Sequence, residues 1–172
     1  MVKRMTLRTI LLLIGIGVVG ALLVSIVMLG RERLLATVFG PVDLSPVDFR
    51  TLTRPQRPNQ YLVCPADFCA AATDAVSLIY GVPAAVLQGR WFAMLAQQPR
   101  VQQIAVSPDG QQYDFLQRSR LWRFPDTITV RFIPLSETQS TLAIYSRAHY
   151  GYSDLGVNRK RVETWLQALQ QP

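Results

Sequence analysis

The chain has 172 residues, 49% of them hydrophobic, and a formal net charge of +7 at pH 7. Residues 1–33 hold five Lys or Arg and one acidic residue, which leaves thirteen basic and ten acidic residues for the remainder. A balance this small excludes an extensive nucleic-acid-binding surface, and about 140 residues suffice for one domain with one hydrophobic core. We therefore expect one folded domain and no nucleic acid among its partners.

An apolar run without a charged residue stands near the N-terminus, from Ile10 to Leu29. A helix rises ~1.5 Å per residue, so this run covers the roughly 30 Å of bilayer hydrocarbon and predicts a transmembrane helix. The basic residues that flank it are Lys3, Arg4 and Arg8 before the run and Arg31 and Arg33 after it. By the positive-inside rule this small excess places the N-terminus in the cytoplasm and the domain outside, which in a bacterium is the periplasm.

A cleaved signal peptide is the alternative interpretation of the same run. Signal peptides have an apolar core of ~7–15 residues that ends in a small-x-small cleavage site. Here the core is longer and is followed by GRERLLATVFG, so we favour a retained anchor in the bacterial inner membrane. The chain is then divided into a cytoplasmic tail and anchor over 1–33, an extended arm or linker over 34–60, and a folded domain over 61–172.

Residues 40–60 hold four of the eleven prolines and show almost no periodicity, which predicts an extended segment. It is either a stiff spacer or an arm laid across the domain, and the apolar Phe49 and Leu52 favour the arm. Residues 61–63 follow as a short edge strand. Cys64 and Cys69 come next, and in an oxidising compartment a disulfide between them is favoured over free buried thiols or redox and metal chemistry.

The rest of the domain alternates between helix and strand patterns. Proline at the first turn predicts a helix over 83–98, and a second helix with an apolar stripe is expected over 157–170. Between them, alternating apolar and polar residues predict strands, over 101–107, 112–123, 127–133 and 141–148. We therefore expect an α+β fold, an antiparallel four-stranded meander with both helices packed on its apolar face, preceded by one transmembrane helix. The other face of the sheet is expected to stay polar.

Residues of catalytic type are present but do not form a known constellation. His149, Ser153 and Asp154 lie within six residues of one another, whereas a working triad is assembled from separated elements. One histidine and two neighbouring cysteines give poor support for a metal centre, and no glycine-rich phosphate loop is present. We expect no cofactor and no metal.

Arginines offer a better candidate site. Several lie on successive predicted strands or at the start of the last helix, with polar neighbours that complete an anion-binding or protein-docking surface: Arg118, Arg120, Arg131, Tyr145, Arg147, Asp154, Asn158 and Arg161, with Arg159 as an alternative to Arg161. The structural alternative is that these arginines pair with Asp126, Asp154 and Glu163 and fix strand ends and the GYSDLGVN turn.

One group of motifs resembles the family called domain of unknown function 1499. The hallmarks are an Arg-Ser-Arg strand, a Phe-Pro-Asp turn and a long closing segment, which here are residues 118–120, residues 124–126, and Ser146, Arg147, Gly151, Ser153, Asp154, Gly156, Asn158 and Arg161. The resemblance covers about residues 46–169. It implies a bacterial envelope-associated domain and supports the arm, but it brings no established activity. Members often have Ser-Arg where this chain has Ala148-His149, which argues against His149 as an essential base.

Three functions remain open. The favoured one is a non-catalytic binding module or accessory subunit, with an integral membrane protein complex as the candidate partner. The second is an envelope enzyme that acts on lipid or cell-wall material through Ser153, Asp154 and Asn158. The third is a structural module in which Gly151 and Gly156 supply positive φ angles and the polar residues cap the last helix.

Overall fold

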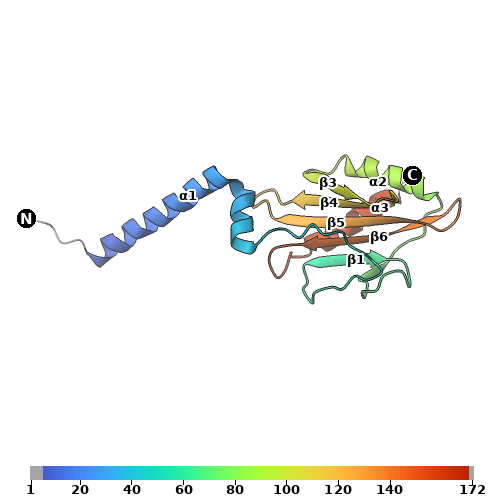
Figure 1. The fold of residues 1–172 in the computed structure, drawn as a ribbon, viewed down its shortest axis with the longest axis horizontal. Helices are drawn as coiled ribbons and strands as arrows, with labels where there is room; N and C mark the ends of the chain where they lie inside the picture. Colours follow the sequence, from blue (N-terminus) through green and yellow to red (C-terminus); the bar gives the residue numbers. More distant parts are fainter. Residues whose placement is uncertain (1–5, 171–172) are drawn as a thin grey trace, which may run out of the picture. The chain divides into compact units, whose positions relative to one another are not determined.

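The computed structural model of the protein describes residues 6–170, except for the side chains of residues 27–29. The described chain divides into two compact units, the first ending at Pro41 and the second beginning at Val42 (Figure 1).

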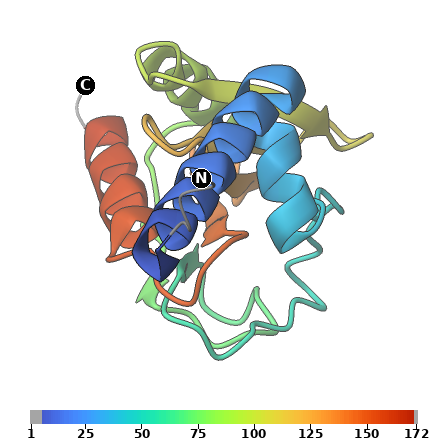
Figure 2. The ribbon, with the colours of Figure 1, turned by 90° about the vertical axis from the view of Figure 1, so that its left-hand side faces the viewer.

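The first unit consists of helix α1, Leu7–Phe39. Thr6 precedes it, and the Thr6 hydroxyl accepts a hydrogen bond from the amide of Thr9. The segment Leu7–Ile26 has a mean hydropathy of 2.7 and is not buried at all, so it is long and apolar enough to cross a membrane. The prediction of an apolar N-terminal helix is thus confirmed, with this segment beginning at Leu7. At Gly30 the φ angle is 71°, a left-handed value that suits glycine, and the helix bends there (Figure 2).

A six-stranded sheet forms the second unit, in the order β2-β1-β6-β5-β4-β3. The strands are β1 (Gln60–Cys64), β2 (Ala75–Val76), β3 (Val101–Val106), β4 (Gln112–Arg118), β5 (Pro125–Pro134) and β6 (Ser140–Ala148). Strands β3 to β6 form the predicted antiparallel meander. The sheet has two strands more than the four predicted, because β1 pairs with β6 and β2 adds a parallel edge beside β1.

Two strand predictions need correction. Strand β1 is not an edge strand: all five of its residues are buried. The chain returns beside it because the Asp74 carboxylate accepts a hydrogen bond from the amide of Leu62 at 2.7 Å. Strand β4 ends at Arg118 rather than at 123, since Ser119 and Phe124 close a turn with an amide-to-carbonyl bond of 2.9 Å. Arg120 therefore lies in an exposed turn and not on a strand.

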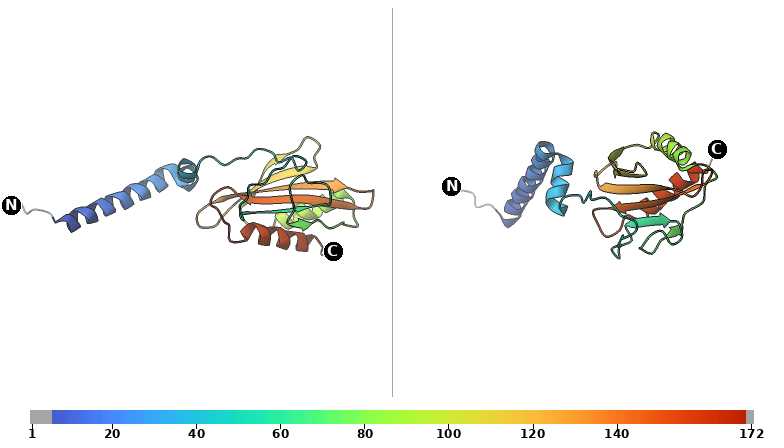
Figure 3. Two further views of the ribbon diagram at one scale, coloured as in Figure 1. Left: turned by 90° about the horizontal axis from the view of Figure 1, so that it is seen from below. Right: turned by 45° about the vertical axis from the view of Figure 1, so that its right-hand side comes forward.

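Helices α2 (Ala84–Leu95) and α3 (Val157–Leu169) pack on one face of the sheet, as predicted, and α3 is seen along that face in Figure 3. Trp91 of α2 is fully buried at the centre of this core. Its ring meets the ring of Trp165 of α3 edge-on at 5.5 Å, a favoured geometry for aromatic pairs. Contacts with Phe115 and Phe132 of the sheet complete the aromatic centre of the core.

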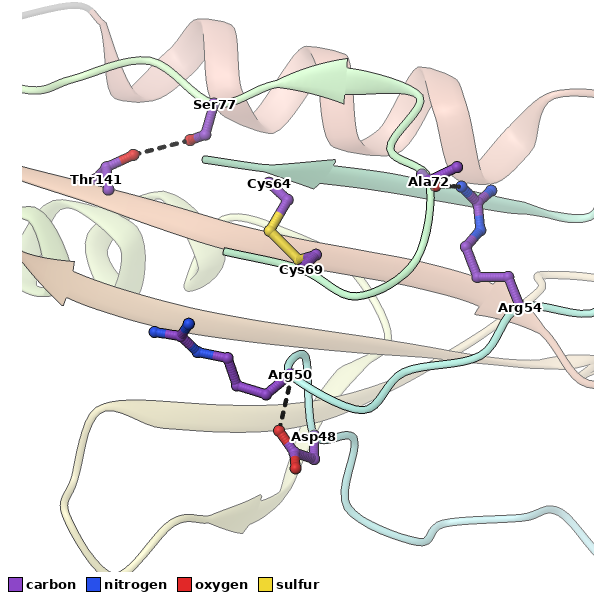
Figure 4. The surroundings of a disulfide bond; sticks show 8 residues. All are labelled: Asp48, Arg50, Arg54, Cys64, Cys69, Ala72, Ser77 and Thr141. Carbon is purple, nitrogen blue, oxygen red and sulfur yellow. Dashed lines mark hydrogen bonds between the residues drawn. A yellow bond between two sulfur atoms is a disulfide. The ribbon is translucent and has the colours of Figure 1, made fainter. Parts of the chain in front are cut away.

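The opposite face of the sheet is not the open polar surface that the alternation predicted. A second apolar cluster covers part of it, formed by Val47, Phe49, Leu62, Cys64, Ala143 and Tyr145. Phe49 is 1% exposed, so the proline-rich segment lies on the sheet as an arm. A disulfide joins Cys64 to Cys69 and holds the following loop against the same cluster (Figure 4). The alternation of apolar and polar residues in the strands did not predict this covering layer. Some of the covering residues belong to the proline-rich segment, whose sequence shows no periodicity.

Candidate functional site

Arg161, in the second turn of α3, is the centre of a buried polar network. Its side chain is only 8% exposed and forms a salt bridge to the Asp126 carboxylate at 2.6 Å. It also donates hydrogen bonds to Gln117 at 2.6 Å and to the hydroxyl of Ser146 at 2.9 Å. The guanidinium thereby links α3 to strands β4, β5 and β6, since these three partners lie on three different strands.

Asn158 extends the network towards the start of α3 and is fully buried. Its side-chain amide donates to the carbonyl of Asn59 at 3.2 Å and to the Asp154 carboxylate at 2.7 Å. Asp154 also accepts from the amides of Gly156 at 3.0 Å and Asn158 at 2.7 Å. Both carboxylate oxygens of Asp154 therefore accept hydrogen bonds from backbone amides at the start of the helix, whose N-cap residue is Gly156.

The pKa of the Asp126 carboxyl reflects two opposing effects. Burial raises the pKa, while the charge and hydrogen bond of Arg161 lower it, and the net direction is upward. Burial is thus the larger effect, and the arginine partly offsets it.

A cleft of about 360 Å³ lies beside this network, between the first turns of α3 and the ends of β3 and β4. Four arginine or lysine residues and one aspartate line it, namely Arg100, Arg118, Lys160, Arg161 and Asp126. Arg100 stands opposite Arg118 and donates to the Arg118 carbonyl at 3.1 Å. Because Asp126 is already paired with Arg161, the remaining charge of the lining is positive. Guanidinium and ammonium groups in such a cleft favour phosphate or carboxylate ligands.

Arg131 and Arg147 share one face of the sheet, as the alternation predicted, but they lie in different places on it. Arg131 pairs with Asp109 at 2.6 Å and lines a cleft of about 290 Å³ beneath the arm. Arg147 donates to the hydroxyl of Thr127 at 3.2 Å and lies 5.7 Å from the ring centre of Tyr145. Tyr145 is buried and donates its hydroxyl hydrogen to Gln60.

The predicted site residues therefore fall into three groups. Arg118, Asp154, Asn158 and Arg161 gather on the α3 side of the sheet, Arg131, Tyr145 and Arg147 lie under the arm, and Arg120 is in the turn after β4. Sequence reasoning did not single out Arg100 or Lys160 as ligand-binding residues. Arg100 could have been found from the register of the hairpin, which places it beside Arg118.

Residues 52–169 match a family model described as "Protein of unknown function (DUF1499)". The chain belongs to this family. The match covers more than half of the chain, and the resemblance seen in the sequence motifs is thus confirmed. No curated protein and no solved structure matches the chain.

The turn of the DUF1499 domain that carries Ser153 provides no assembled catalytic group. The Ser153 hydroxyl accepts from the amide of Leu155 at 3.2 Å, and Asp154 and Asn158 are engaged in starting α3. Between residues 6 and 170, no three His, Cys, Asp or Glu side chains gather in a way that could hold a metal ion. The geometry of this turn supports a structural role.

His149 follows β6 of the DUF1499 domain, and its ring nitrogen Nε2 lies 3.0 Å from the hydroxyl of Thr127. Burial, with a smaller effect from the Arg147 charge, lowers the pKa of His149 from 6.5 to about 4, and Asp43 opposes this shift. The folded chain therefore keeps this side chain neutral in a pH range where the unfolded chain protonates it. The neutral form is stabilised by folding, so stability must fall as the pH drops through this range.

We expect His149→Gln to weaken the loss of stability between pH 6.5 and about 4. Urea unfolding of both proteins across this range measures the effect, and the comparison cancels the titration of the carboxyl groups. Since His149 is the single histidine, its NMR titration reports its pKa directly. Equal pH dependence of the two proteins would contradict the assignment.

Proposed function

We infer that this chain is a single-pass membrane protein whose second unit is a non-catalytic module that binds a phosphate-bearing anion. One observation carries the proposal: the cleft beside α3 is lined by four arginine or lysine residues and by a single acidic residue, Asp126, which is already paired with Arg161. Arg161 is engaged in the buried polar network, so the ligand is assigned to Arg100 and Lys160. Planar guanidinium groups match two phosphate oxygens at once, and Lys160 adds a point charge.

The orientation of the chain in the membrane is inferred from the apolar segment and the charges that flank it. The segment Leu7–Ile26 is apolar enough to span a membrane, and the flanking charges favour a cytoplasmic N-terminus. The disulfide between Cys64 and Cys69 supports an oxidising compartment, because such bonds are rare in the cytosol. We therefore place the DUF1499 domain in the periplasm of a bacterium, where an integral membrane protein complex is the candidate partner.

An experiment on the cleft uses the full chain purified in detergent, with inorganic phosphate and glycerol 3-phosphate as probes. We expect Arg100→Gln combined with Lys160→Gln to weaken binding of the preferred probe by about tenfold or more, because each lost charge-assisted hydrogen bond is worth about 1.5–3 kcal/mol. Isothermal titration calorimetry measures the affinities. Preference for glycerol 3-phosphate over inorganic phosphate would point to a lipid headgroup, and the reverse would point to free phosphate.

Arg90→Gln is the matched control. Arg90 is an exposed arginine of α2 that does not line the cleft, so its replacement removes a positive charge elsewhere and should leave affinity unchanged. Equal affinity of the double variant and the wild type would show that phosphate binds elsewhere. Failure of both probes to bind the wild type would overturn the proposed ligand class.

A further inference from the structure

Two loops lie side by side at one end of the sheet. Residues 119–124 join β4 to β5, and residues 149–156 join β6 to α3. The register pairs Arg118 with Pro125 and Asp126 with Ala148, so both loops leave the sheet at the same end. They touch through the rings of Phe124 and Tyr150, whose centres are 6.3 Å apart. The amide of His149 also donates to the carbonyl of Pro125 at 3.2 Å.

The tips of these loops expose large apolar side chains. Leu121 is 66% exposed, Trp122 65%, Tyr152 70% and Leu155 94%. Leu155 also has a φ angle of 55°, in the left-handed region that leucine rarely adopts. Such a residue gains nothing from packing inside the domain, so an external apolar surrounding is the natural explanation for its exposure.

Basic residues surround these tips. Arg118, Arg120 and Arg123 lie in or beside the first loop, while Arg159 and Lys160 follow the second loop in the first turns of α3. The first loop contains no acidic residue, and Asp154 of the second loop is engaged in starting α3. Exposed Trp, Tyr and Leu with a border of Arg and Lys is the composition of protein surfaces that lie in the interface of an anionic bilayer.

The second unit also begins at this end of the sheet. Its second residue, Asp43, lies 3.9 Å from the guanidinium of Arg147, which is next to the last residue of β6. Residues 27–42 connect the apolar segment to this point, and residues 27–39 are part of α1. With ~1.5 Å per helical residue and ~3.5 Å per extended one, this connection reaches about 30 Å. The loops thus leave the sheet at the end where the chain arrives from its anchor.

We propose that this end of the domain docks on the surface of the bilayer that holds α1, with Leu121, Trp122, Tyr152 and Leu155 in the interfacial layer and the surrounding basic side chains on lipid phosphates. The proposal rests on the membrane anchor of the proposed function. It commits to anionic lipid as the occupant, because a membrane anchor would confine the domain to the neighbourhood of a bilayer and because the border is basic. The cleft beside α3 opens at the same end, where half-exposed Val157 lines it.

Tryptophan fluorescence in proteoliposomes tests the docking of the full chain. Of the three tryptophans, Trp91 and Trp165 are 0% and 3% exposed, and residues 1–41 contain none. Lipid brominated on its acyl chains should therefore quench Trp122 selectively. We expect quenching in the wild type that grows with the share of phosphatidylglycerol, disappears in Trp122→Phe, and falls at least twofold in Leu121→Glu combined with Leu155→Glu.

Leu135→Glu is the matched control, since Leu135 is 48% exposed but follows β5 at the opposite end of the sheet, and it should leave quenching unchanged. Flotation after an alkaline wash separates the two proposals. A chain that leaves the vesicles lacks the anchor, whereas a chain that stays but shows no quenching overturns the docking alone. A blue-shifted Trp122 emission without quenching would show that a protein surface covers the loops, which also overturns it.

Discussion

Replacement of Arg161 with methionine should lower the free energy of unfolding by about 3–5 kcal/mol, because it leaves the buried Asp126 carboxylate without its partner. The salt bridge is 2.6 Å long and the arginine side chain is only 8% exposed, so solvent cannot replace it. The substitution also removes the hydrogen bonds to Gln117 and Ser146. Urea unfolding of the full chain in detergent, followed by circular dichroism, measures the change.

Arg159→Met is the control for this prediction on the same helix. Arg159 pairs with Glu163 at 2.8 Å, but its side chain is 67% exposed, so its replacement should lower the free energy of unfolding far less than Arg161→Met does. In Arg161→Met the pKa of Asp126 should rise further, since burial and the charge of Asp154, which both raise it, are then no longer opposed by the arginine. A raised carboxyl pKa in the folded state means that the variant regains stability as the pH is lowered. Equal urea midpoints for the two variants would refute the central role of Arg161.

Phe49→Ala should also cost about 3–5 kcal/mol, the usual range for removing a buried aromatic ring. Phe49 is 1% exposed, and its ring lies 6.4 Å from that of Phe68 in the disulfide loop. Its carbonyl accepts a hydrogen bond from the amide of Ala70 at 3.0 Å. Loss of the ring removes the main apolar contact of the arm, so the arm should detach before the rest of the domain unfolds.

Limited trypsin digestion measures that detachment, because Arg50, Arg54 and Arg57 all lie in the arm. Cleavage there should be much faster in Phe49→Ala than in the wild type. Leu44→Ala is the control: Leu44 belongs to the same segment but is 47% exposed, so stability should change by no more than about 0.5 kcal/mol. A Phe49→Ala protein with wild-type stability and digestion would show that the arm contributes little to the fold.

The meander and both helices could be predicted because each carries a local period. Strand β5 alternates Ile128, Val130 and Phe132 into the core with polar residues on the other side, and register and burial follow from that pattern. Strand β1 could not be placed in the sheet interior, since its neighbour β2 is held by a hydrogen bond from Leu62 to Asp74 across the disulfide loop. Long-range contacts of this kind leave no periodic trace in the sequence.

The same limit applies to the candidate site. The pairing of Arg161 with Asp126 was among the alternatives that the sequence offered, since both belong to the closing and turn motifs. Whether Arg161 binds a ligand or pairs with Asp126 depends on how deeply its side chain is buried. The alternation of apolar and polar residues does not predict that burial at the start of a helix. Arg100 escaped notice because it precedes β3 without any motif, and only the hairpin register brings it to the cleft.

The two borders of the sheet have a consequence for contacts between copies of this chain. Unpaired outer strands can pair with the strands of a neighbouring molecule and lead to polymerisation. One border is β2, only two residues long, and the other is β3, where the pairing shifts between Gln103 and Ala105. Short or irregular outer strands present no continuous row of amides and carbonyls to a neighbouring molecule. Crowded copies of this chain are therefore protected from joining their sheets into fibres.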